Sequence, residues 1–506
     1  MVKFVVFENL LNELKPYNTV LFILLVGLIL APIILLNPDG KINLGFTELS
    51  FISQKDILEP KIQEKKDISK IVASVDTTGL EKAIIEPLTI EKKKIKVKSQ
   101  TNVEKKNQER VRKEPAKSKR VNKDESSTLF LNHYATEKLS DFFSKLAKIS
   151  EERKKLHILH YGDSQIEGDR MTVYLRQRIQ NQFGGNGPGL IPAMNVYVTK
   201  TFIQNYSENF ERYTCFGGEK LPEGNYGVMG AAAKFKTDSI LKEGWIEIEP
   251  SNRAQSRARY YNQAKLFYTD CKVNCSITVY HNGDVILEDY LISDGGYHML
   301  PLQFTGKIGK LKYVFKGEES PVFCGFSLEG DYGVQVDNIG MRGCSGTIFN
   351  RLEKSTFKSM LNDLQSELIL LQFGGNSVPY FKDSLSVRRY ARVFQSQIKT
   401  IKKLYPTAAI IVIGPSDMSL LSNGIYETYK FLPYCVNQMK LASGKEGAGY
   451  WDLFKAMGGK NSMPSWVESG LAGRDYIHFS NKGASIASQM FYDALELEYS
   501  KWKMNQ

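Results

Sequence analysis

Between residues 334 and 500, short uninterrupted apolar runs alternate with longer amphipathic segments, and this alternation is the strongest constraint on the fold. The runs have the length of strands, and the longer segments carry apolar residues at helical spacing. Strands that are apolar throughout are typical of parallel sheets covered by helices on both faces. We therefore expect an α/β domain with a parallel central sheet. The expected strands are 334–339, 368–373, 408–413 and 450–453, and the expected helices are 347–364, 384–404, 426–441 and 481–499.

An earlier part of the chain supplies elements of the same kind. The apolar run at 157–161 predicts a buried strand, and the segments at 135–149 and 171–183 predict helices. The tripeptide Gly162-Asp163-Ser164 follows this strand directly. We expect residues 127–195 and 334–506 to form one domain, with 157–161 as its first strand.

Residues 196–333, between these two parts, show a different pattern. Their short alternating runs are broken by Gly, Asn and Asp, and Asn282-Gly283 is a strong signal for a hairpin. We predict an all-β module inserted between the first and second strands of the sheet. Its aromatic residues either stack on sugars or fill its own core, and they include Tyr260, Tyr261, Phe267 and Tyr268.

The N-terminal region carries a long apolar stretch. No charged residue occurs from Pro16 to Pro38, and residues 20–36 are almost purely apolar. A helix needs about 20 apolar residues to span a bilayer, and no small-residue cleavage site follows. We therefore expect residues 1–38 to form a transmembrane anchor of a single-pass protein in the inner (cytoplasmic) membrane, rather than a cleaved signal peptide. The remaining chain is expected to be extracytoplasmic or periplasmic, with residues 39–126 as a charged, largely disordered stalk.

The net charge of +12 is concentrated in one segment. Residues 91–125 hold 14 Lys and Arg against 6 Asp and Glu. A protein that binds single-stranded nucleic acid needs aromatic residues among its basic ones, and this segment has none. We expect no nucleic-acid partner. The six cysteines include no CxxC pair, so we expect neither a metal site nor a cofactor. Whether any disulfides form stays open.

Three groups of polar residues stand where an active site of an α/β domain would lie. Ser164 follows the first strand, Asn376 follows the strand 368–373 after two glycines, and Asp475 and His478 precede the last helix. Ligands of open α/β sheets bind at the carboxyl ends of the strands. A nucleophilic serine needs a base, and the base needs a group that orients it. Each pattern also occurs in ordinary turns and helix caps, so the residues alone leave both interpretations open.

In their order and spacing these groups resemble the sequence blocks of SGNH (GDSL-like) hydrolases. The resemblance covers about residues 150–195 and 334–500. Gln165 stands where many members of the family have leucine. The matching blocks are Gly162-Asp163-Ser164, Asn338–Gly343, Gly374-Gly375-Asn376 and Asp475–His478.

The resemblance implies a three-layer fold and the chemistry of a carboxylic ester hydrolase. Carried over residue by residue, Ser164 would attack the ester carbonyl, His478 would take its proton, and Asp475 would hold the imidazole. The oxyanion hole would consist of the backbone N–H groups of Ser164 and Gly343 and the side chain of Asn376.

A narrower resemblance concerns the stretch from Trp451 to His478, which is similar to bacterial peptidoglycan O-acetylesterases and related envelope O-acetyltransferases. Those relatives also carry a carbohydrate-binding-like β module between the first two blocks. The expected function is hydrolysis of O-acetyl esters on a cell-envelope glycan. One alternative is an O-acetyltransferase that uses the same triad and receives acetyl from a membrane partner. Another is a glycan-binding scaffold without activity.

Overall fold

The computed structural model describes residues 16–37, 41–43, 48–50, 63, 65–75, 128–237, 242–305 and 309–506. The chain divides into two units. The first comprises residues 1–65 together with 419–427, and the second comprises residues 66–418 together with 428–506. The candidate site residues all belong to the second unit.

The first unit contains helix α2 (Pro16–Leu36), strands β1 (Lys41–Asn43) and β2 (Glu48–Ser50), and most of the hairpin β19 (Ser419–Ser422) and β20 (Ile425–Thr428). The apolar stretch is helical, as expected. Within the described part of the chain, however, no helix is both long enough and apolar enough to cross a membrane. The structure therefore does not support the predicted transmembrane helix.

The predicted stalk, 39–126, contains ordered segments. Strands β1 and β2 pair with each other, and helix α4 (Ser69–Ala73) belongs to the second unit. The backbone N–H of Lys66 donates to Ser465 Oγ at 2.9 Å, and Ile68 is buried in the core of the α/β domain. These short segments are ordered, and Ile68 packs on the α/β domain, whereas the character of the stalk as a whole stays a prediction. The basic segment 91–125 lies outside the described residues.

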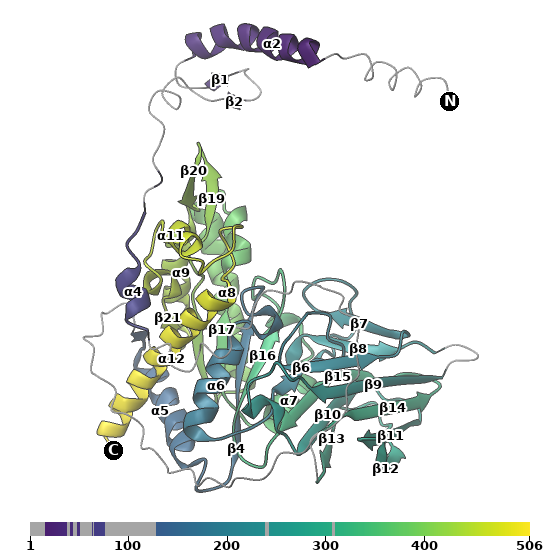
Figure 1. Ribbon diagram of the computed structural model, residues 1–506. Helices are drawn as coiled ribbons and strands as arrows, with labels where there is room; N and C mark the ends of the chain where they lie inside the picture. The colour runs from purple at the N-terminus through teal and green to yellow at the C-terminus, as the bar shows by residue number, and fades with distance from the viewer. Residues whose placement is uncertain are drawn as a thin grey trace, which may run out of the picture. The chain divides into compact units, whose positions relative to one another are not determined.

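The second unit is built around a parallel sheet with the strand order β16-β4-β17-β18-β21-β3 (Figure 1). The first five strands are parallel, and β3 is antiparallel to β21. In chain order the parallel strands are 2-1-3-4-5, so the winding direction reverses beside β4. The strands are β3 (Leu129–Phe130), β4 (Lys155–Gly162), β16 (Gly333–Gly340), β17 (Ser366–Gln372), β18 (Ala409–Ile413) and β21 (Gly449–Trp451).

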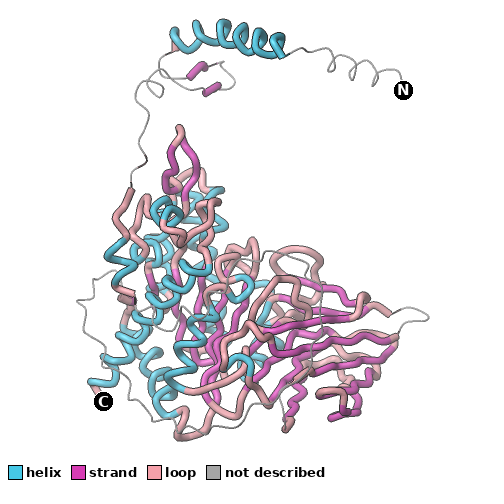
Figure 2. Tube along the Cα trace, in the orientation of Figure 1, coloured by secondary structure: helices cyan, strands magenta, loops and turns pink. Residues whose placement is uncertain are grey.

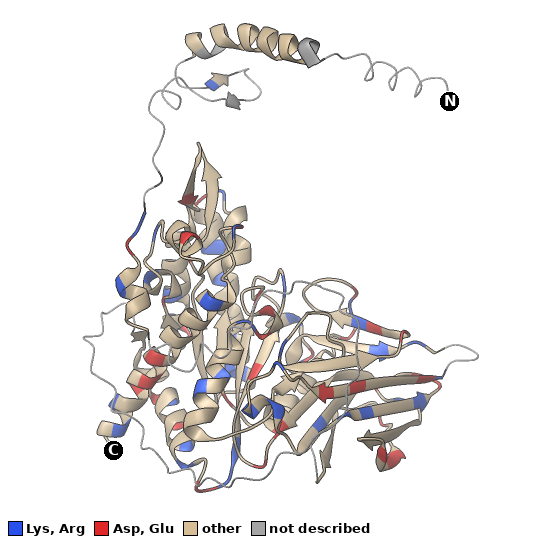
Figure 3. Cartoon of the chain, viewed as in Figure 1, with Lys and Arg blue, Asp and Glu red and all other residues tan. Residues whose placement is uncertain are grey.

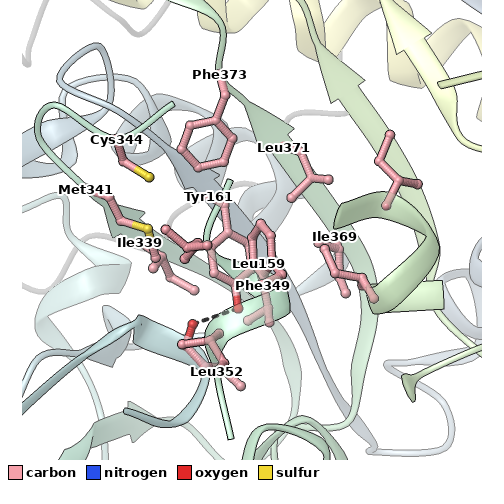
Figure 4. Packing of buried hydrophobic residues seen from close by; sticks show 14 of the residues in the cluster. Leu159, Tyr161, Ile339, Met341, Cys344, Phe349, Leu352, Ile369, Leu371 and Phe373 are labelled. Carbon is pink, nitrogen blue, oxygen red and sulfur yellow. Dashed lines mark hydrogen bonds between the residues drawn. The ribbon is translucent and has the colours of Figure 1, made fainter. Parts of the chain in front are cut away.

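Helices cover both faces of this sheet, so the α/β domain has the three layers that the resemblance implied (Figure 2). Successive strand residues face opposite sides. Ile158 packs with helices α5 (His133–Lys148), α6 (Thr172–Phe183) and α12 (Asn481–Met504), whereas Leu159 and Tyr161 pack on the side of α7 (Lys354–Asp363), α8 (Ser384–Leu404) and α9 (Leu432–Lys445). Figure 4 shows the second cluster, where Tyr161 lies beside Phe349 and Ile339. Shorter helices are η6 (Phe349–Arg351), α10 (Leu453–Ala456) and α11 (Met463–Glu468).

Two of the expected helices begin later than their sequence pattern predicts. The helix expected at 426–441 is α9, which begins at Leu432 with a proline in its first turn, after strand β20. The helix expected at 347–364 is α7, where Glu353 caps the N-terminus by accepting from Ser355 and Thr356 N–H groups. Local capping chemistry sets both starts.

Residues 202–329 form a β-sandwich of two antiparallel sheets around one shared core. The sheet orders are β13-β10-β15-β8-β7, with β5 also paired to β15, and β12-β11-β14-β9-β6. Asn282 and Gly283 connect β11 to β12 with positive φ, as a tight hairpin requires. The strands are β5 (Gly189–Ile191), β6 (Phe202–Tyr206), β7 (Phe210–Thr214), β8 (Ala231–Phe235), β9 (Glu243–Pro250), β10 (Gln263–Thr269), β11 (Cys275–His281), β12 (Asp284–Tyr290), β13 (His298–Gln303), β14 (Leu311–Gly317) and β15 (Val322–Glu329); the 3-10 helices η4 (Gly227–Met229) and η5 (Arg257–Arg259) join them.

The aromatic residues singled out in the module have mixed roles. Tyr261, Phe267 and Tyr268 are buried in hydrophobic clusters, whereas Tyr260 is 56% exposed. Only Tyr260 of these four therefore has a ring surface available to a sugar. Acidic and basic residues are interspersed over the sandwich and the α/β domain in the view of Figure 3.

A buried group of charges joins the sandwich to the parallel sheet. Glu329 at the end of β15 is 0% exposed, and its carboxylate lies 2.8 Å from Lys155 Nζ and 3.1 Å from Lys265 Nζ. His157 of β4 contacts the same carboxylate at 3.3 Å and the Asp337 carboxylate at 2.7 Å. Burial acts to raise the pKa of Glu329, but His157 and the two lysines outweigh it and hold that pKa well below its usual range. Breaking such a group leaves uncompensated charge in the interior.

We predict that Glu329→Gln lowers the free energy of unfolding by about 3–5 kcal/mol, because His157 and both lysines lose their shared counter-charge. The matched control is Glu318→Gln, whose carboxylate pairs with Lys242 and is 71% exposed. Such an exposed pair contributes about 1 kcal/mol or less. Urea unfolding of both variants measures the difference. Equal stability losses would contradict the role assigned to Glu329.

Candidate active site

The nucleophile turn begins where β4 leaves the sheet. Gly162 is the last paired residue of β4, and a Cβ there would lie 3.0 Å from Gln372 O and 2.9 Å from the Ile166 side chain. Ser164 follows two residues later. The segment after it is a turn and the 3-10 helix η3 (Glu167–Asp169), and α6 begins only at Thr172. Ser164 therefore lies in a turn well before the helix, which begins close to the predicted position.

The structure brings Ser164, His478 and Asp475 into one hydrogen-bonded chain. Ser164 Oγ lies 2.8 Å from His478 Nε2, and His478 Nδ1 lies 2.7 Å from Asp475 Oδ2. The serine and the histidine are 314 residues apart in the sequence. This is the geometry of a nucleophile, a base and the group that orients the base.

The loop that carries the histidine is held by its own aspartate. Asp475 Oδ1 accepts from the backbone N–H groups of Ile477 at 3.0 Å and His478 at 3.1 Å, so the carboxylate binds both the loop and the imidazole. Tyr476 adopts φ +57, a strained conformation for a bulky residue. Partial burial acts to raise the pKa of Asp475, but the hydrogen bonds from His478 and Ile477 outweigh it, so the pKa is lowered. The carboxylate stays ionised at neutral pH.

The expected oxyanion donors gather at the same edge of the sheet. Gly340 of β16 and Gln372 of β17 both pair with Gly162, so the loops that follow these strands meet beside Ser164. The backbone N–H groups of Ser164 and Gly343 donate to no other group among the described residues. Gly343 has φ +76, which a side chain would disfavour. These N–H groups are available for an oxyanion.

Asn376 lies in η7 (Gly375–Tyr380) at the end of β17. Its Nδ2 donates to Cys344 O at 3.1 Å, and its side chain also interacts with Asp163. Burial raises the pKa of Asp163 to about 6, although the Gln165 N–H and Asn376 act to lower it. Donation from Asn376 to an oxyanion requires its amide to exchange one of these partners, and this role stays a prediction.

A buried polar chain supports the nucleophile turn from below. Asn338 donates to Ile166 O at 2.9 Å and to Thr172 Oγ1 at 2.8 Å, and Thr172 Oγ1 lies 3.0 Å from His160 Nδ1. His160 Nε2 lies 2.9 Å from Gln372 Oε1. Burial lowers the pKa of His160 to about 4, so this imidazole is neutral at neutral pH. His160 is thus a buried residue of the core.

Three contacts at the site were not predicted. Gln165 bonds to the histidine loop, and Arg342 forms a two-point ion pair with Glu167 at 2.5 and 2.6 Å. The same guanidinium lies over the Tyr197 ring at 5.4 Å. Arg342 directly precedes Gly343, so its ion pair links the oxyanion loop to the nucleophile turn. In the sequence each of these contacts corresponds only to a single charged, amide or aromatic residue. Such residues are common on any surface, so they do not indicate the contacts.

A cavity lies beside the nucleophile turn, between the α/β domain and the module. Gly168 and Gly340 line it from the domain, and Tyr197 and Arg212 line it from the side of the module. The Arg212 guanidinium stacks on Tyr197 at 5.6 Å, and its buried Nε has no hydrogen-bond partner. A guanidinium that borders a cavity suits a polar ligand.

The described residues include no group of three or more His, Cys, Asp or Glu that could hold a metal ion. All six cysteines are buried free thiols, so none of them forms a disulfide, a question that the sequence left open. The site therefore offers a serine, an imidazole and carboxylates as its reactive groups.

No protein-family model matches the chain, and no curated protein matches its sequence. Among solved structures, a peptidoglycan O-acetylesterase is similar over 73% of this chain and 99% of its own length, with 21% identity and a TM-score of 0.59. The chain shares the fold of that structure, which is the three-layer fold expected from the resemblance to SGNH hydrolases. Residues 127–195 and 334–506 make up less than half of the chain, so the similarity extends into the inserted module.

Other solved structures match the chain with lower scores. A carbohydrate acetylesterase from Sinorhizobium meliloti matches 32% of this chain and 78% of its own, with 13% identity and a TM-score of 0.24. A family two carbohydrate esterase from Clostridium thermocellum in complex with cellohexaose matches 57% of this chain and 99% of its own, with 11% identity and a TM-score of 0.22. Both TM-scores are well below that of the peptidoglycan O-acetylesterase.

We predict that Asp475→Asn lowers kcat on 4-nitrophenyl acetate by about 10³–10⁴-fold, because the amide no longer holds the imidazole with Nε2 as acceptor. Asp383→Asn is the matched control, since Asp383 caps α8 away from the triad and its loss leaves kcat unchanged. Steady-state kinetics of the two variants measure this. A kcat within a few-fold of wild type for Asp475→Asn would remove Asp475 from the triad.

Proposed function

We propose that this chain is a serine esterase that removes O-acetyl groups from a cell-envelope glycan such as peptidoglycan. The observation that carries the proposal is the unbroken hydrogen-bonded chain Ser164–His478–Asp475 at the carboxyl edge of a parallel sheet. It stands next to the point where the winding reverses, where open α/β sheets bind ligands.

In the first half of the reaction, Ser164 Oγ attacks the acetyl carbonyl carbon while its proton passes to His478 Nε2 at 2.8 Å. The ionised Asp475 stabilises the imidazolium. The N–H groups of Ser164 and Gly343 receive the negative charge on the carbonyl oxygen. The C–O bond to the sugar then breaks, His478 returns the proton to the leaving sugar hydroxyl, and Ser164 carries the acetyl group.

In the second half, His478 takes a proton from water, and the resulting oxygen nucleophile attacks the acetyl-serine carbonyl. The bond to Ser164 Oγ breaks, the serine regains its proton from His478, and acetate leaves. His478 is 31% exposed on its side chain, so water reaches the base directly. Hydrolysis of the acyl-serine requires this access.

The substrate class is supported by the structural likeness and by the module. A solved structure similar over most of this chain is that of a peptidoglycan O-acetylesterase. The sandwich borders the cavity beside the nucleophile turn and contributes Arg212 to it, where Tyr197 also lies. Binding energy from such remote contacts can position an acetyl group on a polymer.

Transfer of acetyl to a glycan is the alternative, because it uses the same acyl-serine and differs only in the attacking hydroxyl. It would require a membrane partner that supplies acetyl. Release of acetate in water, without an acceptor, separates the two reactions.

The location of the enzyme is also a proposal. An extracytoplasmic catalytic domain at the inner membrane accords with the charge-free apolar sequence at 20–36 and with the place of envelope glycans.

We predict that residues 66–506 release acetate from O-acetylated peptidoglycan in water, and that Ser164→Ala abolishes this release with an unchanged unfolding temperature. Ser164 is partly exposed in a turn, so the lost hydroxyl affects chemistry and not packing. Acetate is measured by a coupled enzymatic assay. Acetyl transfer to an added sugar, with no acetate released in its absence, would identify the transferase instead.

We predict that Arg212→Ala lowers kcat/KM on polymeric O-acetylated glycan by about tenfold, since the loss of one hydrogen bond from a charged side chain to the substrate costs about 1.5 kcal/mol. The same variant should keep its activity on 4-nitrophenyl acetate, which has no sugar units to contact Arg212. Lys316→Ala, an exposed lysine at the far sheet of the module, is the control. Equal losses of activity on both substrates would show that Arg212 stabilises the fold and does not bind the polymer.

We predict that alkaline phosphatase fused after residue 506 is active in intact bacteria, because this reporter folds only outside the cytoplasm. A fluorescent protein that matures in the cytoplasm should stay dark at the same position. The opposite pair of results would place the catalytic domain in the cytoplasm.

A further inference from the structure

The side chain that follows the nucleophile reaches across the site to the histidine loop. Gln165 is 9% exposed, and its Nε2 donates to Ile477 O at 2.7 Å. Its Oε1 accepts from the Phe479 N–H at 3.2 Å. One amide thus bonds to the backbone on both sides of His478.

We propose that Gln165 is a positioning residue that sets the distance between Ser164 and His478. This proposal rests on the serine-esterase function proposed above. Gln165 does not touch the reacting atoms; it acts through the backbone of the residues that flank the base.

Hydrogen bonds of the histidine loop show how much depends on this amide. Asp475 satisfies the N–H groups of Ile477 and His478, and the Gly473 N–H donates to His478 O at 2.8 Å. Gln165 satisfies the Ile477 carbonyl and the Phe479 N–H. The bonds from Asp475 and Gly473 are internal to the loop, so they shape it without tying it to the serine.

Two-point attachment is what an amide can supply and an apolar side chain cannot. A donor and an acceptor on one planar group fix both the position and the orientation of the bonded backbone. A third contact, from Gln165 Nε2 to Ser416 Oγ at 3.2 Å, ties the same amide to the loop after β18. The amide therefore joins the loop after β4 to two others.

The surroundings of the triad explain the need for such a brace. The side chains of His478 and Asp475 are 31% and 50% exposed, so packing alone restrains them weakly. The Ser164–His478 hydrogen bond must nevertheless be kept within a narrow range for proton transfer. A displacement of about 1 Å can cost about 10²-fold in rate.

The test compares Gln165→Met with Gln180→Met. Methionine matches the length of glutamine and keeps the volume, but it makes none of the hydrogen bonds of the amide. Gln180 is 1% exposed in α6 and donates to two backbone carbonyls, those of Gly187 and Val334, away from the triad. Both variants therefore lose a buried amide that bonds to backbone.

Four quantities are measured for each full-length variant: the rate of Ser164 labelling by a fluorophosphonate, kcat and KM on 4-nitrophenyl acetate, and the unfolding temperature. Gln165→Met should lower the labelling rate and kcat by about 10²-fold, with KM within about twofold. The unfolding temperature should fall by a similar amount in Gln165→Met and Gln180→Met. The labelling rate of Gln180→Met should stay at the wild-type value.

A Gln165→Met variant labelled as fast as wild type would overturn the proposal, and so would equal losses of labelling in the two variants. A wild-type chain that is not labelled at all would overturn it together with the triad. If the wild type is labelled but releases no acetate from any glycan, only the proposed substrate fails, and the comparison of the two variants still decides the role of Gln165.

Discussion

The backbone pairing of β4 on both of its edges is the constraint on which the site depends. Gly162 pairs with Gly340 on one side and Gln372 on the other, so three strands end at one level. The loops that leave them carry Ser164, Gly343 and Asn376. The winding reverses between these strands, so the crossover connections run to opposite faces and the edge stays open. A one-residue slip of β4 would turn its inward residues outward and move the serine away from the oxyanion donors.

Two kinds of polar interaction hold this frame, and they differ in burial. Glu329 and His157 are buried, their lysine partners are only partly exposed, and the group fixes the sandwich to the same strands that carry the site. The triad is half exposed, and short hydrogen bonds from Asp475 and Gln165 hold its histidine loop. The rigid junction and the accessible site lie at opposite ends of β4. Burial stabilises the scaffold, whereas exposure admits the ester and water.

Much of this arrangement follows from local patterns in the sequence. Strand β4 and helix α8 were predicted nearly at their observed bounds, because continuous apolar runs and helical spacing are local signals. The residues of the triad could be named because each stands in a short motif. Contacts between side chains and distant backbone could not be predicted. Gln165 and Ile477 are 312 residues apart, and no local pattern near either residue indicates their hydrogen bond. The buried charge of Glu329 was also missed, because a glutamate in an alternating strand predicts an exposed position.

The central claim is that Ser164 forms an acyl intermediate with the help of His478. Rapid-quench mass spectrometry of the wild-type chain during turnover of 4-nitrophenyl acetate tests it most directly. We predict one acetyl group on the peptide that contains Ser164, accumulating before the steady state and released as acetate. Turnover with no acetylated peptide, or with the acetyl group on another residue, would contradict it.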